Sequence, residues 1–161
     1  MENQRENLDE NEQETLAAAV ASMLASCPFL PSTITARFED MDAAPGQIGI
    51  FPQSGSVYLQ RFISGAFIGQ YAFQLLYRVG AGADDNARAD AENLLGAIAE
   101  WLEGKNITYK GERFSCVKSP KLSAGRTLQS IERTSTAGLL GVRQDGSLDY
   151  SITLNLTYTK R

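Results

Sequence analysis

The stretch that decides the fold is residues 150–159, YSITLNLTYT. Every second side chain in it is large and apolar: Tyr150, Ile152, Leu154, Leu156 and Tyr158. The side chains between them are the small polar residues Ser, Thr and Asn. Such alternation is typical of a strand that turns one face toward a core and the other face away from it. We therefore expect a β-sheet with one buried face and one polar face.

A second long strand is expected at residues 67–79, FIGQYAFQLLYRV. Its large apolar side chains fall at alternate positions, while Gln70, Gln74 and Arg78 fall on the opposite face. Shorter strands are predicted at 34–39, 48–51 and 57–63, and residues 128–136 are predicted to be extended. Asp145-Gly146 is a hairpin turn signal just before the last strand.

Two stretches have helical periodicity instead. The first carries its apolar residues at Leu16, Val20, Met23, Leu24 and Cys27, and it is predicted to end before Pro28. The second covers residues 84–103, with Asp84 or Asp85 as its cap and Gly104 as its stop. The apolar stripe of this second helix consists of Leu94, Leu95, Ile98, Trp101 and Leu102. The order of elements predicts an α+β fold, an antiparallel or mixed β-sheet flanked by two main helices.

The charge is unevenly distributed along the chain. Residues 1–14 contain six acidic residues against Arg5 alone. We expect residues 1–13 to form a flexible acidic arm, and residues 14–161 to form a single domain. Residues 105–126, in contrast, contain six basic residues against Glu112 alone, and they are expected to form a basic loop. Each charged segment is either a solvated surface or a contact for an oppositely charged partner.

The composition argues against an enzyme. The chain has no histidine, the usual general base and the commonest zinc ligand. The run Gly80-Ala81-Gly82-Ala83 lies between a strand and a helix, but position 85, where a dinucleotide-binding loop needs its third glycine, is Asp85. The acidic cluster of Glu39, Asp40 and Asp42 lacks the spacing of a calcium loop. We therefore expect no catalytic residues, no cofactor and no metal.

The compartment follows from similar features. Cys27 and Cys116 are far apart in the sequence; we expect Cys27 in the core and Cys116 as a surface thiol. The acidic N-terminus does not resemble a signal peptide, and no apolar run is long enough to span a membrane. These features favour synthesis in a reducing cytoplasm, with no membrane partner.

Nucleic-acid binding remains an alternative. Tyr109 and Phe114 alternate with basic residues in the segment 105–126, as base stacking combined with phosphate contacts would require. One basic segment on an otherwise near-neutral chain is weak support for this function.

Several segments together resemble a phage family. They are RFISG at 61–65, QYAFQL at 70–75, the acidic helix start through Trp101-Leu102, QSIE at 129–132, STAGLL at 135–140 and YSITLNLTY at 150–158. In their order and spacing, the chain resembles the minor capsid or tail-terminator-like proteins of tailed phages and of prophages in Gram-positive bacteria. The resemblance covers about residues 14–159. The charged N-terminal segment, residues 1–13, is longer than the corresponding segment expected for the family.

The resemblance implies a structural role without catalytic residues. The expected protein is a tail terminator or tail completion subunit, a homo-oligomer whose hexameric ring caps the tail tube and joins it to the head connector. Its partners would be the major tail tube protein and the head–tail connector, with at most non-specific DNA contact in the ring lumen. It would reside in the virion, in the tail or neck, after synthesis in the bacterial host cytoplasm. A minor capsid or head-completion (neck) protein is the alternative.

Three regions are candidate interfaces for such a ring. The basic loop offers Lys110, Arg113, Lys118 and Lys121 for partner or lumen contacts. The polar strand face offers Gln70, Gln74 and Arg78 for a subunit contact. The apolar, glycine-broken segment offers Ala137, Leu139 and Leu140 as a second patch.

Overall fold

A computed structural model describes residues 15–30, 35–38, 47–54, 56–120, 122 and 125–161 of the chain. After a first helix, described over residues 15–25, the elements are β1 (Thr35–Phe38), β2 (Gln47–Pro52), β3 (Tyr58–Arg61), β4 (Phe67–Val79), α2 (Asp85–Leu102), β5 (Ile107–Tyr109), β6 (Glu112–Phe114), β7 (Arg126–Arg133), β8 (Gly138–Val142) and β9 (Leu148–Lys160). The predicted α+β class is confirmed, and each predicted strand overlaps an observed strand whose ends differ from the predicted ones by at most three residues. The predicted arm at residues 1–13 lies outside the described residues.

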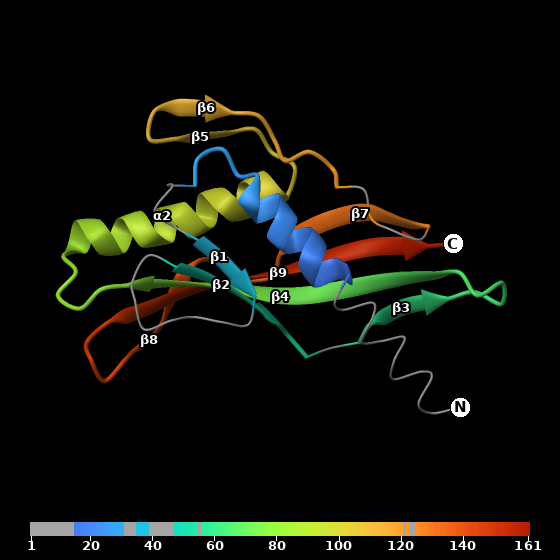
Figure 1. The fold of residues 1–161 in the computed structure, drawn as a ribbon, viewed down its shortest axis with the longest axis horizontal. Coiled ribbons are helices and arrows are strands. Elements are labelled where there is room, and N and C mark those ends of the chain that lie inside the picture. The colour runs from blue at the N-terminus through green and yellow to red at the C-terminus, as the bar shows by residue number, and fades with distance from the viewer. Residues whose placement is uncertain (1–14, 31–34, 39–46, 55, 121, 123–124) are drawn as a thin grey trace.

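The sheet is built around β4 and β9, which are 13 residues long each and pair antiparallel along their whole length. β2 and β3 pair with the free side of β4 at its two ends, and β7 and β8 do the same along β9. β1 pairs with β2 in parallel, so the sheet is mixed. This arrangement puts β3 and β8 at diagonally opposite corners of the sheet (Figure 1).

Both helices lie over the same face of the sheet (Figure 1). The alternation seen in the sequence fixes which face they cover, because the buried apolar side chains of β4 and β9 fall at alternate positions and share that face. The central residues, Phe73, Leu75, Ile152, Leu154 and Leu156, are fully buried beneath the helices. α2 begins with Asp84 as its N-cap, whose carboxylate accepts a hydrogen bond from the backbone N–H of Ala87 at 2.9 Å.

The structure corrects the prediction of a basic loop at 105–126. Part of this segment is a small antiparallel hairpin, β5–β6, which forms a sheet of its own above α2 (Figure 1). Its turn holds Lys110 at φ 49° and Gly111 at φ 81°. Positive φ at both central residues is the signature of the tight turns that suit the twist of a hairpin. The three-residue strands were too short to give a detectable period in the sequence.

Candidate assembly surfaces

The face of the sheet opposite the helices carries the predicted polar row. Gln70 and Gln74 of β4 stand opposite Thr157 and Thr153 of β9, as the alternation predicts. Gln70 is held within the chain, because its Nε2 donates to the backbone oxygen of Ser56 at 2.7 Å and its Oε1 accepts from Asn155 at 3.2 Å. Of the two glutamines, Gln74 is therefore better placed than Gln70 to contact another protein.

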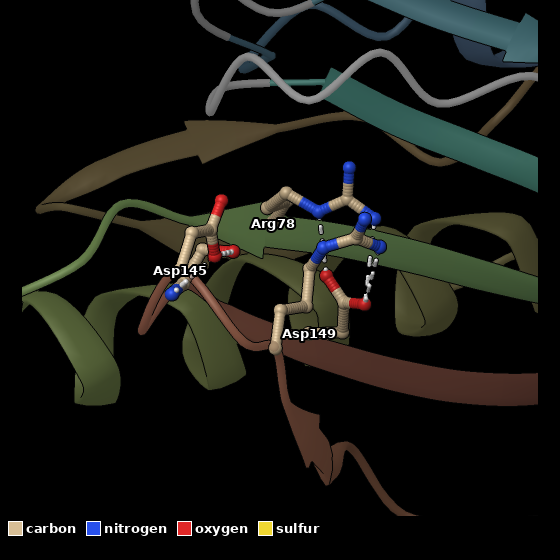
Figure 2. Close-up of polar contacts among 5 residues, drawn as sticks. Arg78, Asp145 and Asp149 are labelled. Atoms are coloured by element: carbon tan, nitrogen blue, oxygen red, sulfur yellow. Dashed lines mark hydrogen bonds and ion pairs between the residues drawn. The ribbon is translucent and has the colours of Figure 1, made fainter.

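Arg78 lies at the end of the same row but is only 4 % exposed. Its Nε donates to Oδ1 of Asp149 at 2.8 Å, directly across from it on β9 (Figure 2). Arg143 approaches the other oxygen of Asp149 at 3.9 Å. Arg78 thus serves an ion pair inside the chain, and its place in an intersubunit contact, as expected from the sequence, would require that pair to rearrange.

The turn between β8 and β9 contains the predicted Asp-Gly signal. Oδ1 of Asp145 accepts hydrogen bonds from the backbone N–H and the hydroxyl of Ser147, at 2.9 and 2.6 Å (Figure 2). These two bonds lower the pKa of Asp145 below its ordinary value, the side-chain bond contributing most. The carboxylate stays charged, and it sits exposed at the tip of the turn.

The basic residues of the β5–β6 region are exposed. Lys110 sits at the tip of the turn, Arg113 lies on β6, and Lys118 follows in the segment beyond it. Lys121 lies outside the described residues. The hairpin that carries these charges is anchored to the end of α2, because Trp101 Nε1 donates to the backbone oxygen of Ser115 at 3.0 Å.

Tyr109 and Phe114 are partly buried and pack within the domain, which argues against the base stacking that the nucleic-acid alternative requires. Both rings pack against Phe29, with centroids 5.3 and 5.4 Å from that of Phe29, and Trp101 makes an edge-to-face contact with the same ring. Burial, reinforced by the charge of Asp90, raises the pKa of Tyr109. The aromatic residues therefore hold the hairpin onto the domain.

The apolar segment predicted as a second patch forms the edge strand β8. Leu139 and Leu140 are about half exposed, and Val142 beside them is more so, while Ala137 is half-buried. β8 pairs on one side only, with β9, in the part of the chain that the structure describes. An exposed apolar edge strand is unusual in a protein that works alone.

A second apolar patch, at the β3–β4 hairpin, was not predicted. Leu59, Phe62 and Ile63 are exposed there, and Ile63, at the tip, is completely open to solvent. The turn itself is well formed: the backbone N–H of Phe62 donates to Ala66 and that of Gly65 donates to Phe62. The sequence signal was the pair Phe62-Ile63 immediately before the Ser64-Gly65 turn, where an isolated hairpin has no need for large apolar residues.

The described residues contain no group of three potential metal ligands. Cys27 is buried, as predicted, and burial raises the pKa of its thiol, whereas Cys116 is exposed. None of the helices in the described part of the chain has the length and apolar character to cross a membrane.

Comparison with known proteins finds a likeness among solved structures. No protein-family model and no curated protein sequence matches the chain. Among solved structures, a chain from the "Virion of native gene transfer agent (GTA) particle" superposes with a TM-score of 0.54 at 14% identity. The superposition covers 89% of this chain and 94% of that chain, so the two share one fold over nearly their whole lengths.

Proposed function

We propose that this chain is a structural protein of a phage-like virion, a tail terminator or tail-completion subunit. In this role it forms a hexameric ring that caps the tail tube, stops its growth and joins it to the head connector. Its partners are further copies of itself, the major tail tube protein and the connector. It has no catalytic role, and it reaches the virion after synthesis in the host cytoplasm.

The observation that carries the proposal is the likeness to a chain of a gene transfer agent virion, which extends over nearly all of both chains. The resemblance of the sequence segments to tail-terminator-like proteins of phages and prophages of Gram-positive bacteria points the same way. The surface adds a third argument: two exposed apolar patches stand on edge elements of the sheet. Patches of this kind mark contacts between proteins.

A head-completion, neck or minor capsid protein is the second candidate, because the virion likeness applies to any of these positions. A nucleic-acid-binding module has less support, since Tyr109 and Phe114 pack within the domain. The exposed Lys110, Arg113 and Lys118 suit at most non-specific contact with DNA in a ring lumen.

Deletion of the gene from the particle-producing strain, followed by electron microscopy, tests the proposal. Loss of a terminator leaves tube growth unchecked, so we expect tails of irregular, extended length beside filled heads. Normal tails on heads that lose their DNA would instead identify a head-completion protein. Unaltered, infective particles would remove the virion role altogether.

A further inference from the structure

The two apolar patches lie at opposite ends of the same sheet. One is the hairpin end, defined here as the β3–β4 hairpin with the adjoining ends of β7 and β9; the other is the β8 end, defined as β8 with the β8–β9 turn and the loop before α2. In Figure 1 they occupy the two extremes of the long β4–β9 pair. The β8–β9 turn and that loop are in contact, since a Cβ at Gly146 would lie 3.3 Å from that of Ala81. The molecule therefore presents two separate exposed apolar surfaces, facing apart.

The hairpin end is basic. Arg61, Phe67, Lys160 and Arg126 stand side by side in one row across four strands. Directly opposed like charges such as Lys160 and Arg126 weaken a sheet, so the fold alone does not favour this row. Arg126 and Lys160 make further contacts within the chain, and Arg61 carries the most exposed charge. Residues 56–67, 125–131 and 157–161 contain no acidic residue.

A hollow opens beside this row. Its walls include the side chains of Tyr58, Phe62 and Phe67, and Arg61 and Lys160 border it. The guanidinium of Arg61 lies over the Tyr58 ring, 3.7 Å from its centroid. Such a hollow suits an apolar side chain that is accompanied by a carboxylate.

The β8 end has that composition. Its exposed side chains include Leu139, Leu140 and Val142, and the strand leads into the turn that carries the ionised Asp145. Asp84 and Asp85 are exposed on the neighbouring loop and helix start. The opposing basic residues are Arg143 and the exposed Arg88 in the first turn of α2, since Arg78 and Asp149 neutralise one another. Acidic residues therefore outnumber basic ones around the exposed apolar side chains of this end.

We infer that the hairpin end of one copy docks on the β8 end of the next copy, head to tail. Each end repels its own kind by charge and attracts the other, so a two-fold contact of like ends is disfavoured. In a dimer formed by this contact, one copy still has a free hairpin end and the other a free β8 end, so further copies can add. The assembly closes into a ring when the rotation between successive copies brings the last copy back to the first. This inference rests on the proposed ring for its biological use, but the contact itself is a property of the purified chain.

Two variants test the contact, each blocking one end at an exposed position. Ile63→Asp puts a charge at the tip of the hairpin end, and Leu140→Asp puts one on the β8 end. Each variant alone lacks one of the two surfaces, so we expect both to be monomers under conditions where the wild type associates, with apparent affinity reduced at least about tenfold. Asn93→Asp adds the same charge to an exposed position on α2 and should associate like the wild type.

Mixing the two variants gives the decisive measurement by light scattering. The Leu140→Asp copy keeps its hairpin end and the Ile63→Asp copy keeps its β8 end, so an equimolar mixture should form a heterodimer and stop there. Association of the wild type should also weaken as salt is raised. A wild type that stays monomeric at every concentration, or variants that associate unchanged or fail to pair when mixed, would overturn the inference. Loss of association on removing residues 1–13 would also overturn it. The acidic N-terminal residues of a neighbouring copy, and not its β8 end, would then be the partner of the basic hairpin end.

The outcome is separable from that of the proposed function. If Ile63→Asp is monomeric yet supports tails of normal length, the head-to-tail contact is not used in the particle and the terminator role stands. If the contact forms as described but gene deletion leaves the tails unaltered, the contact stands and the terminator role fails.

Discussion

Gly69 and Tyr158 face one another across β4 and β9, and the tyrosine ring lies where a side chain at position 69 would project. A Cβ at Gly69 would approach Cζ of Tyr158 to 2.6 Å. Tyr158 is fully buried, so its ring has no free space to move into. Here a glycine is required by close packing of a neighbour, while its backbone is ordinary for a strand.

We therefore predict that Gly69→Ala lowers the free energy of unfolding by about 1–3 kcal/mol, the usual cost of overpacking a core. Gly96→Ala is the matched control, because Gly96 is inside α2 and a Cβ there would meet no atom within 4 Å. The control should be stabilised by about 0.5–1 kcal/mol, since alanine is the better helix former. Urea unfolding of both variants measures the difference, and equal effects would contradict the packing argument.

At the level of elements, the β5–β6 hairpin depends on Phe29, which follows the first helix. The rings of Tyr109, Phe114 and Trp101 all contact Phe29. The strands of the hairpin have three residues each, which is too few to be stable alone. The position of the basic residues on the surface is thus set by one aromatic cluster.

Phe29→Ala should cost about 3–5 kcal/mol and release the hairpin. Trp101 is the only tryptophan in the chain, so its fluorescence reports on this cluster directly, and its emission should shift to longer wavelength. Hydrogen exchange of residues 107–114 should accelerate more than that of β4. Phe62→Ala, which removes an exposed ring in the separate β3–β4 hairpin, is the control and should leave the emission of Trp101 unchanged.

The tyrosines around α2 predict a weakness at alkaline pH. Burial, reinforced by the negative charge of Asp90, raises the pKa of both Tyr77 and Tyr109 above the ordinary value of 10.0. A raised pKa in the folded state means that this contribution to stability is present below about pH 10 and is lost as the pH rises through the folded value. Urea unfolding at neutral and alkaline pH should show the loss, and Tyr77→Phe should reduce it. An unchanged pH dependence in that variant would exclude Tyr77 as a source.

The sequence predicts the long elements well and the short ones poorly. β4 and β9 are long enough for alternation to be unambiguous, and α2 combines a capping Asp84 with a regular apolar stripe. β5 and β6 are too short for a period, and Lys110-Gly111 is a weaker turn signal than Asn-Gly. Of the candidate interface residues, Leu139 and Leu140 are exposed, whereas Arg78 is held in an ion pair within the chain. The exposure of Ile63 was missed because the sequence puts it in a predicted strand at 57–63, whereas β3 ends at Arg61 and leaves Ile63 in the turn.

At the scale of the whole molecule, three surfaces point in different directions. The two ends of the sheet are the apolar, oppositely charged surfaces of the inferred self-contact. The β5–β6 hairpin stands above α2, away from the sheet, and carries Lys110 and Arg113 (Figure 1). A ring built through the ends of the sheet would leave this basic hairpin free to meet something other than a neighbouring copy.

That separation makes the last prediction specific. Arg113→Glu with Lys118→Glu reverses two exposed charges, so the fold and the self-association of the purified protein should remain as in the wild type. If the basic hairpin meets the tube, the connector or DNA, incorporation of the double variant into particles should fall several-fold, because like charges then face an acidic partner. Arg88→Glu, which reverses an exposed charge on α2, is the control.

The measurement is the amount of each variant bound to purified particles, determined by immunoblot. Normal incorporation of the double variant would show that the basic residues of the hairpin are not needed for assembly. Reduced incorporation together with a loss of self-association would mean that the hairpin belongs to the contact between copies.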